Sequence, residues 1–188
     1  MGTTPYANPT SASGANWNNP TNVYTSNNSY SDCNTLNAQL VCGGFSFIWS
    51  VMSADVKRKV IGVEVSIEAR SDGVLGLCPT RGSNHKLGVE CSFDGGSTWE
   101  SPQDTSIYYC PSEYYRTFGG LTYMWSRIIL FEDDLSSTNF KVRVELLEKN
   151  KSANKIYVDH VRARCADAFY RHVSLGTRYA YYDDIRVI

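Results

Sequence analysis

The fold is decided by one short stretch of the sequence, Ser92-Phe93-Asp94-Gly95-Gly96-Ser97-Thr98-Trp99. Apolar residues alternate with small or polar ones from Leu87 to Phe93, which is the period of a strand with one buried face. Asp94-Gly95-Gly96 then supplies residues that tolerate a positive φ, as a tight reversal requires. The hydroxyl and carboxylate groups of the stretch can bond nearby backbone donors, and the indole of Trp99 can fold back over the turn. The stretch therefore predicts a β-hairpin.

The same residues match the pattern S-x-D-x-G-x-T-W at Ser92, Asp94, Gly96, Thr98 and Trp99. This pattern resembles the Asp-box, a hairpin on the rim of sialidases and other β-propellers, and the resemblance implies a structural turn in a β fold without chemistry. A propeller would repeat the motif at blade spacing, and the sequence holds no second copy. We interpret the motif as a lone structural Asp-box within a β-sandwich.

Further segments alternate like strands, and none has a helical period. Leu40 to Val51 contains Gly43-Gly44, which predicts a strand with a bulge. In Lys59 to Arg70 the pattern places Ile61, Val63, Val65, Ile67 and Ala69 inward and Gly62, Glu64, Ser66, Glu68 and Arg70 toward water. Ser106 to Cys110, Asn139 to Leu147 and Ile156 to Cys165 also read as strands. We therefore expect an all-β fold, an antiparallel β-sandwich of the jelly-roll type.

The composition divides the chain into three parts. Residues 1–32 carry no charged residue before Asp32 and read as an N-terminal arm, partly packed on the sandwich through Trp17 and Tyr24. Residues 33–165 form the sandwich core. Residues 166–188 form a C-terminal extension that still has the pattern of strands.

The charge balance excludes several classes of partner. Lys plus Arg is 18 and Asp plus Glu is 19, so the net charge of −1 gives no field that favours nucleic acid or an anionic membrane. No apolar run approaches 18 residues, and no secretion leader is visible, so we predict no membrane insertion.

The chain has six cysteines and no C-x-x-C pair, which argues against zinc and favours disulfides in an extracellular setting. The disulfide candidates are Cys33, Cys42, Cys78, Cys91, Cys110 and Cys165. Their pairing stays open, because six cysteines allow 15 connectivities. In the alternative interpretation, Cys91 and Cys165 are buried thiols.

The order and spacing of several segments, from Trp17-Asn18-Asn19-Pro20 through the Asp-box to Tyr157-Val158-Asp159-His160-Val161, resemble a β-sandwich of phage virion and tail-appendage proteins and of bacterial surface and filament proteins. The resemblance covers roughly residues 16–165 and implies a structural or adhesive role without an assigned active site. The many cysteines and residues 166–188 depart from that pattern.

We find no arrangement of residues typical of catalysis or metal binding. The histidines His85, His160 and His172 lack zinc-ligand spacing. Asp159 and His160 are neighbours on a strand and point to opposite faces, so we expect a buried Asp bonded to backbone and an exposed His. The acidic runs Glu132-Asp133-Asp134 and Asp183-Asp184 could hold calcium, although solvated turns are favoured. We predict no catalytic residue, no metal ligand and no cofactor, hence no enzyme.

The best candidate for a ligand surface is an aromatic group made of Tyr114, Tyr115, Phe118 and Tyr123, on and beside an expected loop over residues 111–120. Exposed rings on a β scaffold can stack on sugars. The alternative is that these rings pack beneath the loop.

The extension offers a route to assembly, because Tyr179, Tyr181, Ile185 and Val187 form one alternating apolar row. Such a strand can pair with its own domain or add to the sheet of a neighbour. We therefore predict a structural subunit whose partners are copies of itself, in an extracellular filament or on a phage particle. The alternative function is a carbohydrate-binding adhesin module whose partners are surface glycans.

Overall fold

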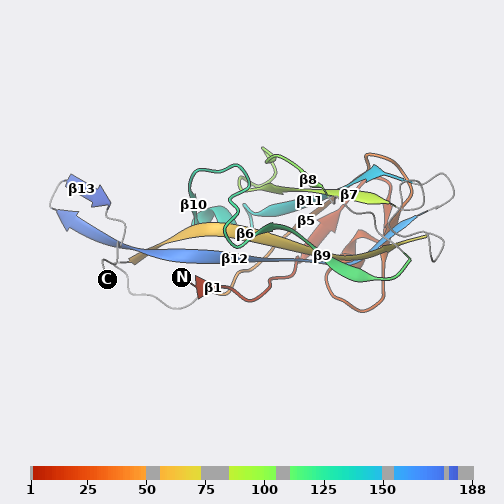
Figure 1. Ribbon diagram of the computed structural model, residues 1–188, viewed down its shortest axis with the longest axis horizontal. Helices are drawn as coiled ribbons and strands as arrows, with labels where there is room; N and C mark the ends of the chain where they lie inside the picture. Colours follow the sequence, from red (N-terminus) through yellow and green to blue (C-terminus); the bar gives the residue numbers. More distant parts are fainter. Residues whose placement is uncertain are drawn as a thin grey trace.

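The computed structural model describes residues 2–49, 56–72, 85–104, 111–149, 155–175 and 178–181, and these residues are mostly strands and loops. The strands form two antiparallel sheets packed face to face (Figure 1). The predicted all-β antiparallel sandwich is thus confirmed. No helix among the described residues has the length and apolar character needed to cross a membrane.

The first sheet, sheet A, has the order β10-β6-β12-β4-β3, with β9 also paired to β6 and with β1 and β13 also paired to β12. Its strands are β1 (Gly2–Thr3), β3 (Trp17–Asn18), β4 (Ser31–Cys33), β6 (Val56–Ser71), β9 (Tyr114–Gly120), β10 (Leu130–Phe131), β12 (Ile156–Leu175) and β13 (Arg178–Tyr181).

The second sheet, sheet B, has the order β2-β5-β11-β7-β8. Its strands are β2 (Ser11–Ser13), β5 (Gln39–Gly43), β7 (Lys86–Ser92), β8 (Gln103–Asp104) and β11 (Lys141–Glu148). Two short 3-10 helices, η1 (Pro20–Val23) and η2 (Glu132–Leu135), lie in the connections.

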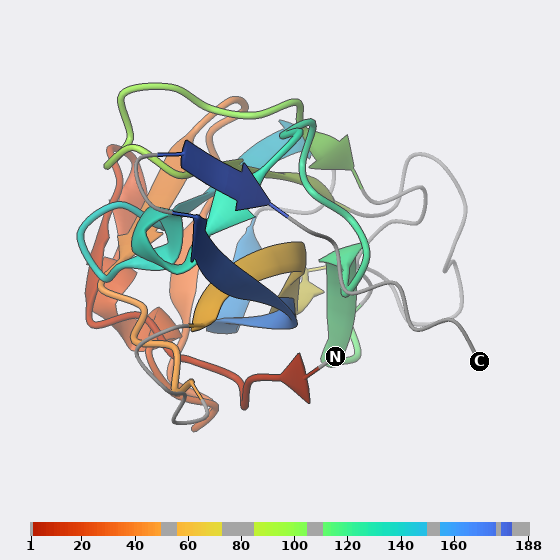
Figure 2. The same cartoon turned by 90° about the vertical axis from the view of Figure 1, so that its left-hand side faces the viewer.

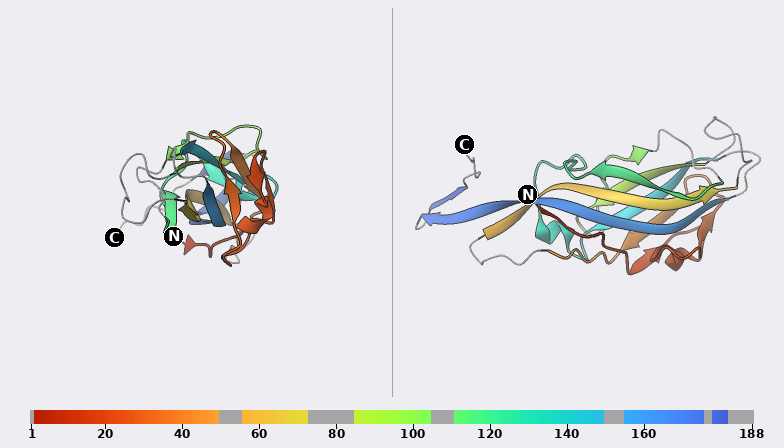
Figure 3. Two further views of the ribbon diagram at one scale, coloured as in Figure 1. Left: turned by 90° about the vertical axis from the view of Figure 1, so that its right-hand side faces the viewer. Right: turned by 60° about the horizontal axis from the view of Figure 1, so that its bottom comes forward.

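The long pair β6 and β12 runs side by side through the length of the molecule (Figure 3). Its register extends from Ser71 opposite Ile156 to Val56 opposite Arg171. Both strands are longer than predicted. β6 runs from Val56 to Ser71, and β12 continues past Cys165 into the segment expected to be a separate extension. The far end of this pair projects beyond the sandwich, and β13 folds back on it (Figures 1 and 2).

The core lies between the inner faces of the two sheets. From sheet A, Val63, Val65, Ile67 and Ala69 are fully buried, as their alternation predicts. Aromatic rings close one part of the core, with Phe140 in contact with Phe45, Phe47 and Phe93 at centroid distances of 5.3, 5.4 and 5.7 Å.

Residues of the predicted N-terminal arm belong to both sheets. The backbone N–H of Ala7 donates to the carbonyl of Ala163 at 2.7 Å, and the reciprocal bond is 2.9 Å. Trp17 is 5% exposed and Val23 is fully buried. The segment is therefore held along β12 and supplies part of the core.

Three local predictions are wrong. The expected loop over residues 111–120 contains β9, which pairs with β6 from Val63 to Ala69. Gly62, Glu64 and Ser66 do not face water, because the segment at Leu121 covers Gly62 and the N-terminal segment and neighbouring side chains cover the other two. After Gly43 the chain leaves sheet B, with Gly44 at φ 73°, and the expected strand to Val51 is not formed through Phe45 and Phe47. The strand expected at residues 106–110 lies outside the described residues.

The segment that follows β9 passes close to the backbone of Gly62 on β6. A Cβ at Gly62 would lie 2.2 Å from the carbonyl carbon of Leu121, whereas a Cβ at Gly120 would meet nothing within 4 Å. Gly62→Ala should therefore lower the free energy of unfolding by about 1 to 3 kcal/mol, because backbone must move. Gly120→Ala should change it by less than about 0.5 kcal/mol. Guanidinium denaturation followed by circular dichroism measures both, and equal losses in the two variants would contradict this packing.

Candidate functional site

The Asp-box stretch forms a compact, hydrogen-bonded turn at the end of β7. Asp94 accepts at Oδ1 from the Ser92 hydroxyl at 2.8 Å and from the Thr98 N–H at 2.9 Å, and at Oδ2 from the Thr98 hydroxyl at 2.5 Å. The Gly96 N–H donates to the Ser92 hydroxyl at 2.8 Å. Gly95 and Gly96 have φ values of 77° and 94°, which explains why glycine occupies both positions.

Neighbouring side chains fix the turn to β11. Lys141 Nζ donates to the carbonyl of Gly95 at 2.6 Å. The guanidinium of Arg143 lies 4.4 Å from the ring centroid of Trp99 and pairs with Glu90 at 2.5 Å. A Cβ at Gly96 would lie 3.6 Å from the Trp99 ring, so the indole covers the turn. All of these groups make structural contacts within the turn or with β11.

The hydrogen bonds of the turn stabilise the charged form of Asp94. The side-chain bond from Thr98, followed by its backbone bond, lowers the pKa of Asp94 well below its usual range. The carboxylate therefore stays ionised in any physiological medium, which suits a turn-forming acceptor and not a proton donor.

The disulfide prediction is wrong for four of the six cysteines. Cys33, Cys42, Cys91 and Cys165 are free, buried thiols. Cys42 and Cys91 both lie opposite Val142, one on each side of β11, so two strand spacings separate them. A disulfide needs Cα atoms within about 7 Å, which this arrangement excludes for this pair. Cys78 and Cys110 lie outside the described residues.

The four aromatic residues predicted to stack on glycans do not form one surface. Tyr114 lies on the core side of β9 beneath Arg116, whereas Tyr115 lies on the opposite face. Phe118 is 4% exposed and belongs to the core. Tyr123 is 38% exposed, and its hydroxyl accepts from Gln103 at 2.7 Å. Of the four, Tyr123 offers the most exposed ring.

The outer face of sheet A carries a network of stacked and paired side chains. The Arg162 guanidinium lies between Tyr6 and Tyr115, at 4.0 and 3.9 Å from their ring centroids. Glu64 accepts from the Tyr6 hydroxyl at 2.5 Å and from Arg164 Nε at 2.7 Å. These contacts hold the N-terminal segment against β12.

Asp159 and His160 lie beside this network, at a bulge in β12. Asp159 is 1% exposed and accepts from the backbone N–H of Asn27, as predicted. His160 is only 6% exposed, so the predicted exposed histidine is wrong. Its ring contacts the Tyr115 hydroxyl at 2.9 Å and Asn8 Oδ1 at 3.0 Å. Burial, and then the charge of Arg162, lowers the pKa of His160, so the ring is neutral at pH 7.

The structure describes only part of the predicted acidic runs and part of the predicted assembly arm. In η2, Asp134 accepts from the backbone N–H of Phe131 at 2.8 Å, which is a structural role. Among the described residues, the carboxylates that do converge are instead Glu68, Glu113 and Asp159. Tyr179 and Tyr181 lie in β13, which pairs with β12 of the same chain. Ile185, Val187 and Asp183-Asp184 lie outside the described residues.

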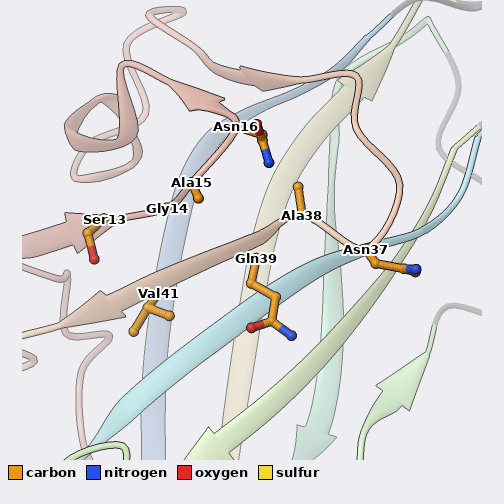
Figure 4. A pocket seen from close by; sticks show the side chains of 8 residues that line it. All are labelled: Ser13, Gly14, Ala15, Asn16, Asn37, Ala38, Gln39 and Val41. Carbon is orange, nitrogen blue, oxygen red and sulfur yellow. The ribbon is translucent and has the colours of Figure 1, made fainter.

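A hollow of about 460 Å³ lies between the turn after β2 and the start of β5 (Figure 4). It is lined by Ser13, Gly14, Ala15, Asn16, Asn37, Ala38, Gln39 and Val41. None of these lining residues carries a charge, and the polar groups are amides and a hydroxyl. Such groups bind neutral polar ligands and cannot transfer protons at neutral pH.

Backbone geometry sets the walls of the hollow. Asn16 and Asn37 both have left-handed backbones, with φ values of 65° and 61°. A Cβ at Gly14 would lie 2.5 Å from the carbonyl oxygen of Gln39, so the two walls approach as closely as glycine allows. The N–H of Asn37 donates to the carbonyl of Leu146 at 2.9 Å, which ties one wall to the end of β11.

Sequence reasoning missed this hollow. Its two walls come from segments more than 20 residues apart, and neither segment carries a known motif. The usable signal was a pair of asparagines in turn-forming stretches, Asn16 and Asn37, because asparagine is the residue after glycine that best tolerates the left-handed region.

A comparison with models of protein families finds no match, and a comparison with curated proteins finds none either. Among solved structures, the chain is similar to the CBM32 of AlyQ in complex with 4,5-unsaturated mannuronic acid, with 9% identity and a TM-score of 0.45 over 85% of this chain and 97% of that one. It is also similar to the CBM22-1 xylan-binding domain from Paenibacillus barcinonensis Xyn10C, with 11% identity and a TM-score of 0.29 over 87% and 86%. TM-scores below 0.5 at this identity identify neither a family nor a ligand for this chain.

The Asp-box turn predicts a specific acid sensitivity. Because the pKa of Asp94 is lower in the folded chain than in the unfolded one, its stabilising effect is complete above the unfolded value of about 3.9 and is lost as pH falls toward the folded value. Asp94→Asn should therefore be less stable than the parent at pH 7, and the difference should shrink below about pH 4. Thermal unfolding from pH 2 to 7 measures this, with Asp133→Asn, an exposed carboxylate of η2, as control. A difference that stays constant with pH would refute the role of the Asp94 charge.

Proposed function

We propose that this chain is a non-catalytic carbohydrate-binding β-sandwich, and that its sugar site is the hollow between the turn after β2 and the start of β5. The observation that carries the proposal is the lining of that hollow, which combines amide and hydroxyl groups with no charge. An amide offers both a donor and an acceptor, as two neighbouring sugar hydroxyls require. The volume of about 460 Å³ lies in the range of small-ligand sites.

The uncharged lining favours neutral sugars over acidic ones. A uronate or sulfate group would require an arginine or lysine, and no lining residue supplies one. Gln39 Nε2 already donates to Glu145 at 3.2 Å, which leaves its carbonyl oxygen as an acceptor for a sugar hydroxyl. In Figure 4 the Asn16 side chain points from its own wall toward the wall formed by residues 37–39.

The walls are held before a ligand arrives. Asn16 lies in a turn closed by the Trp17 N–H on the Gly14 carbonyl, and Ala38 accepts from the Leu146 N–H at 3.2 Å. A site whose backbone is fixed in this way loses little conformational entropy on binding. Because no lining side chain titrates near neutral pH, binding without chemistry is the activity that these residues support.

The amides can be removed without straining the turns. Asn16→Gly and Asn37→Gly keep the left-handed backbone that each position needs, and both delete a side-chain amide. The double variant should bind its neutral oligosaccharide about tenfold more weakly, because two neutral hydrogen bonds are lost. A glycan array identifies the ligand, and titration calorimetry measures the dissociation constants.

Asn28→Gly is the matched control, since Asn28 also has a positive φ, 59°, and does not line the hollow. Tyr123→Ala tests the exposed ring as a separate stacking surface. The proposal fails if no neutral glycan binds, or if the double variant and the control bind equally well. Loss of binding in Tyr123→Ala alone would move the site to that ring.

A second candidate function is self-assembly outside the cell, and one observation favours it. The ends of β6 and β12 project beyond the sandwich with β13 on one side (Figures 1 and 2). Among the described strands, β13 pairs only with β12, so its other edge can accept a strand of a second copy. A contact of this kind repeats without closing when donor and acceptor surfaces differ, which gives a filament.

Deletion of residues 176–188 tests this second function. Because β13 is removed and the paired length of β6 and β12 remains, the truncated chain should fold and stay monomeric. Light scattering and electron microscopy of the full chain at rising concentration should show growing oligomers. A full chain that stays monomeric at every concentration, or a truncated chain that assembles equally well, would exclude β13 as the linking strand.

A further inference from the structure

Three carboxylates from distant parts of the chain meet on the outer side of sheet A. Glu68 lies on β6, Glu113 directly precedes β9, and Asp159 lies at the bulge of β12. One oxygen from each lies within 4.8 Å of the others. This carboxylate cluster is separate from the hollow proposed to bind sugar.

Two oxygens of the cluster are buried and lack a hydrogen-bond partner. They are Glu68 Oε2 and Glu113 Oε1. Asp159 itself is 1% exposed, and its described partner is a single N–H, that of Asn27, at 3.1 and 3.3 Å from its two oxygens. Buried carboxylate oxygens without a donor are costly, so the site calls for a positively charged ligand or a proton. Burial raises the pKa of Glu113, and together with the charges of Asp159 and Glu68 it outweighs the opposing effects of the Tyr30 hydrogen bond and the Arg70 charge.

Two cationic side chains on this face, Arg70 and Arg162, stack on aromatic rings. Arg70 stacks on Tyr157 and Tyr30, at 4.2 and 4.7 Å from their ring centroids, and its Nη1 lies 4.0 Å from Asp72. Arg162 is held between Tyr6 and Tyr115. Neither arginine donates a hydrogen bond to Glu68 Oε2 or Glu113 Oε1.

We propose that Glu68, Glu113 and Asp159 bind a divalent cation, and that the cation is Ca²⁺. Calcium takes carboxylate oxygens at about 2.3 to 2.6 Å, so its ligand oxygens lie up to roughly 5 Å apart. Separations within 4.8 Å are compatible with that span. Mg²⁺ demands a near-ideal octahedron and gives up its water reluctantly, so an irregular set of three carboxylates suits Ca²⁺ better. Water completes the coordination shell.

The bound cation joins four segments of the chain. Besides β6, β12 and the start of β9, the segment before β4 is attached, because the Asn27 N–H donates to Asp159 and the Tyr30 hydroxyl donates to Glu113 at 3.1 Å. Ca²⁺ therefore stabilises the attachment of the N-terminal segment to sheet A. It acts on the fold and takes no part in sugar binding at the hollow.

Calcium binding is measured on the full chain after chelator treatment and removal of the chelator. At pH 7, titration with CaCl₂ should raise the melting temperature in a saturable way, and calorimetry should give one site per chain. MgCl₂ should have a smaller effect at equal concentration. Glu113→Gln and Glu68→Gln should each weaken Ca²⁺ binding by about tenfold or more, because affinity depends on the charge of the ligands.

The same variants separate a cation site from a purely structural cluster. Without calcium, Glu113→Gln should melt at the same temperature as the parent or higher, because one of three mutually repelling charges is removed. Glu148→Gln, on sheet B, should leave the calcium response unchanged. A parent chain whose melting temperature is insensitive to Ca²⁺, or a Glu68→Gln/Glu113→Gln double variant that still responds, overturns the proposal. A parent that ignores Ca²⁺ and becomes more stable below pH 6 would show that the cluster holds a proton instead.

Discussion

The antiparallel pairing of β6 with β12 is the constraint on which the other features of this molecule depend. It aligns residues 56–71 with residues 156–171, which are about 100 positions apart in the chain. Its inner face supplies Val63, Val65 and Ile67 to the core, and the edge of β12 that faces away from β6 pairs with the N-terminal segment. On the outer face Glu64 and Ser66 are also buried, so polar side chains there must find partners.

On the outer face of β6 and β12, arginine side chains find their partners by stacking on tyrosine rings. Arg162 between Tyr6 and Tyr115, and Arg70 on Tyr30 and Tyr157, keep their charges next to aromatic faces while their stems cover the sheet. The bulge between Val158 and His160 then changes the direction of the side chains. It brings His160 opposite Glu68 and buries Asp159 under the loop of Asn27, which creates the carboxylate cluster.

Local features of this fold could be predicted from the sequence, and features made by distant segments could not. The Asp-box turn is held by bonds between residues two and four apart, so its pattern contains the information needed to predict a tight turn. The alternation of β6 likewise predicted its buried face. In contrast, the sequence of β9 resembles a loop because it contains Arg116, Thr117 and Gly119, which an edge strand tolerates. Only its pairing with β6 makes it a strand. The hollow and the carboxylate cluster depend on which segments meet, which periodicity does not encode.

The cysteines show how packing can override a compositional rule. An even number of cysteines favoured disulfides, but four of them occupy apolar positions between or beside the sheets. Burial raises the pKa of Cys42 to about 12 and that of Cys165 to about 12, so neither forms the thiolate that disulfide exchange requires. Cys42 and Cys91 flank Val142 in sheet B and fill the space of a small apolar side chain. These four residues fill apolar positions as free thiols, and their number therefore gives no reason to assign the chain to an oxidising compartment.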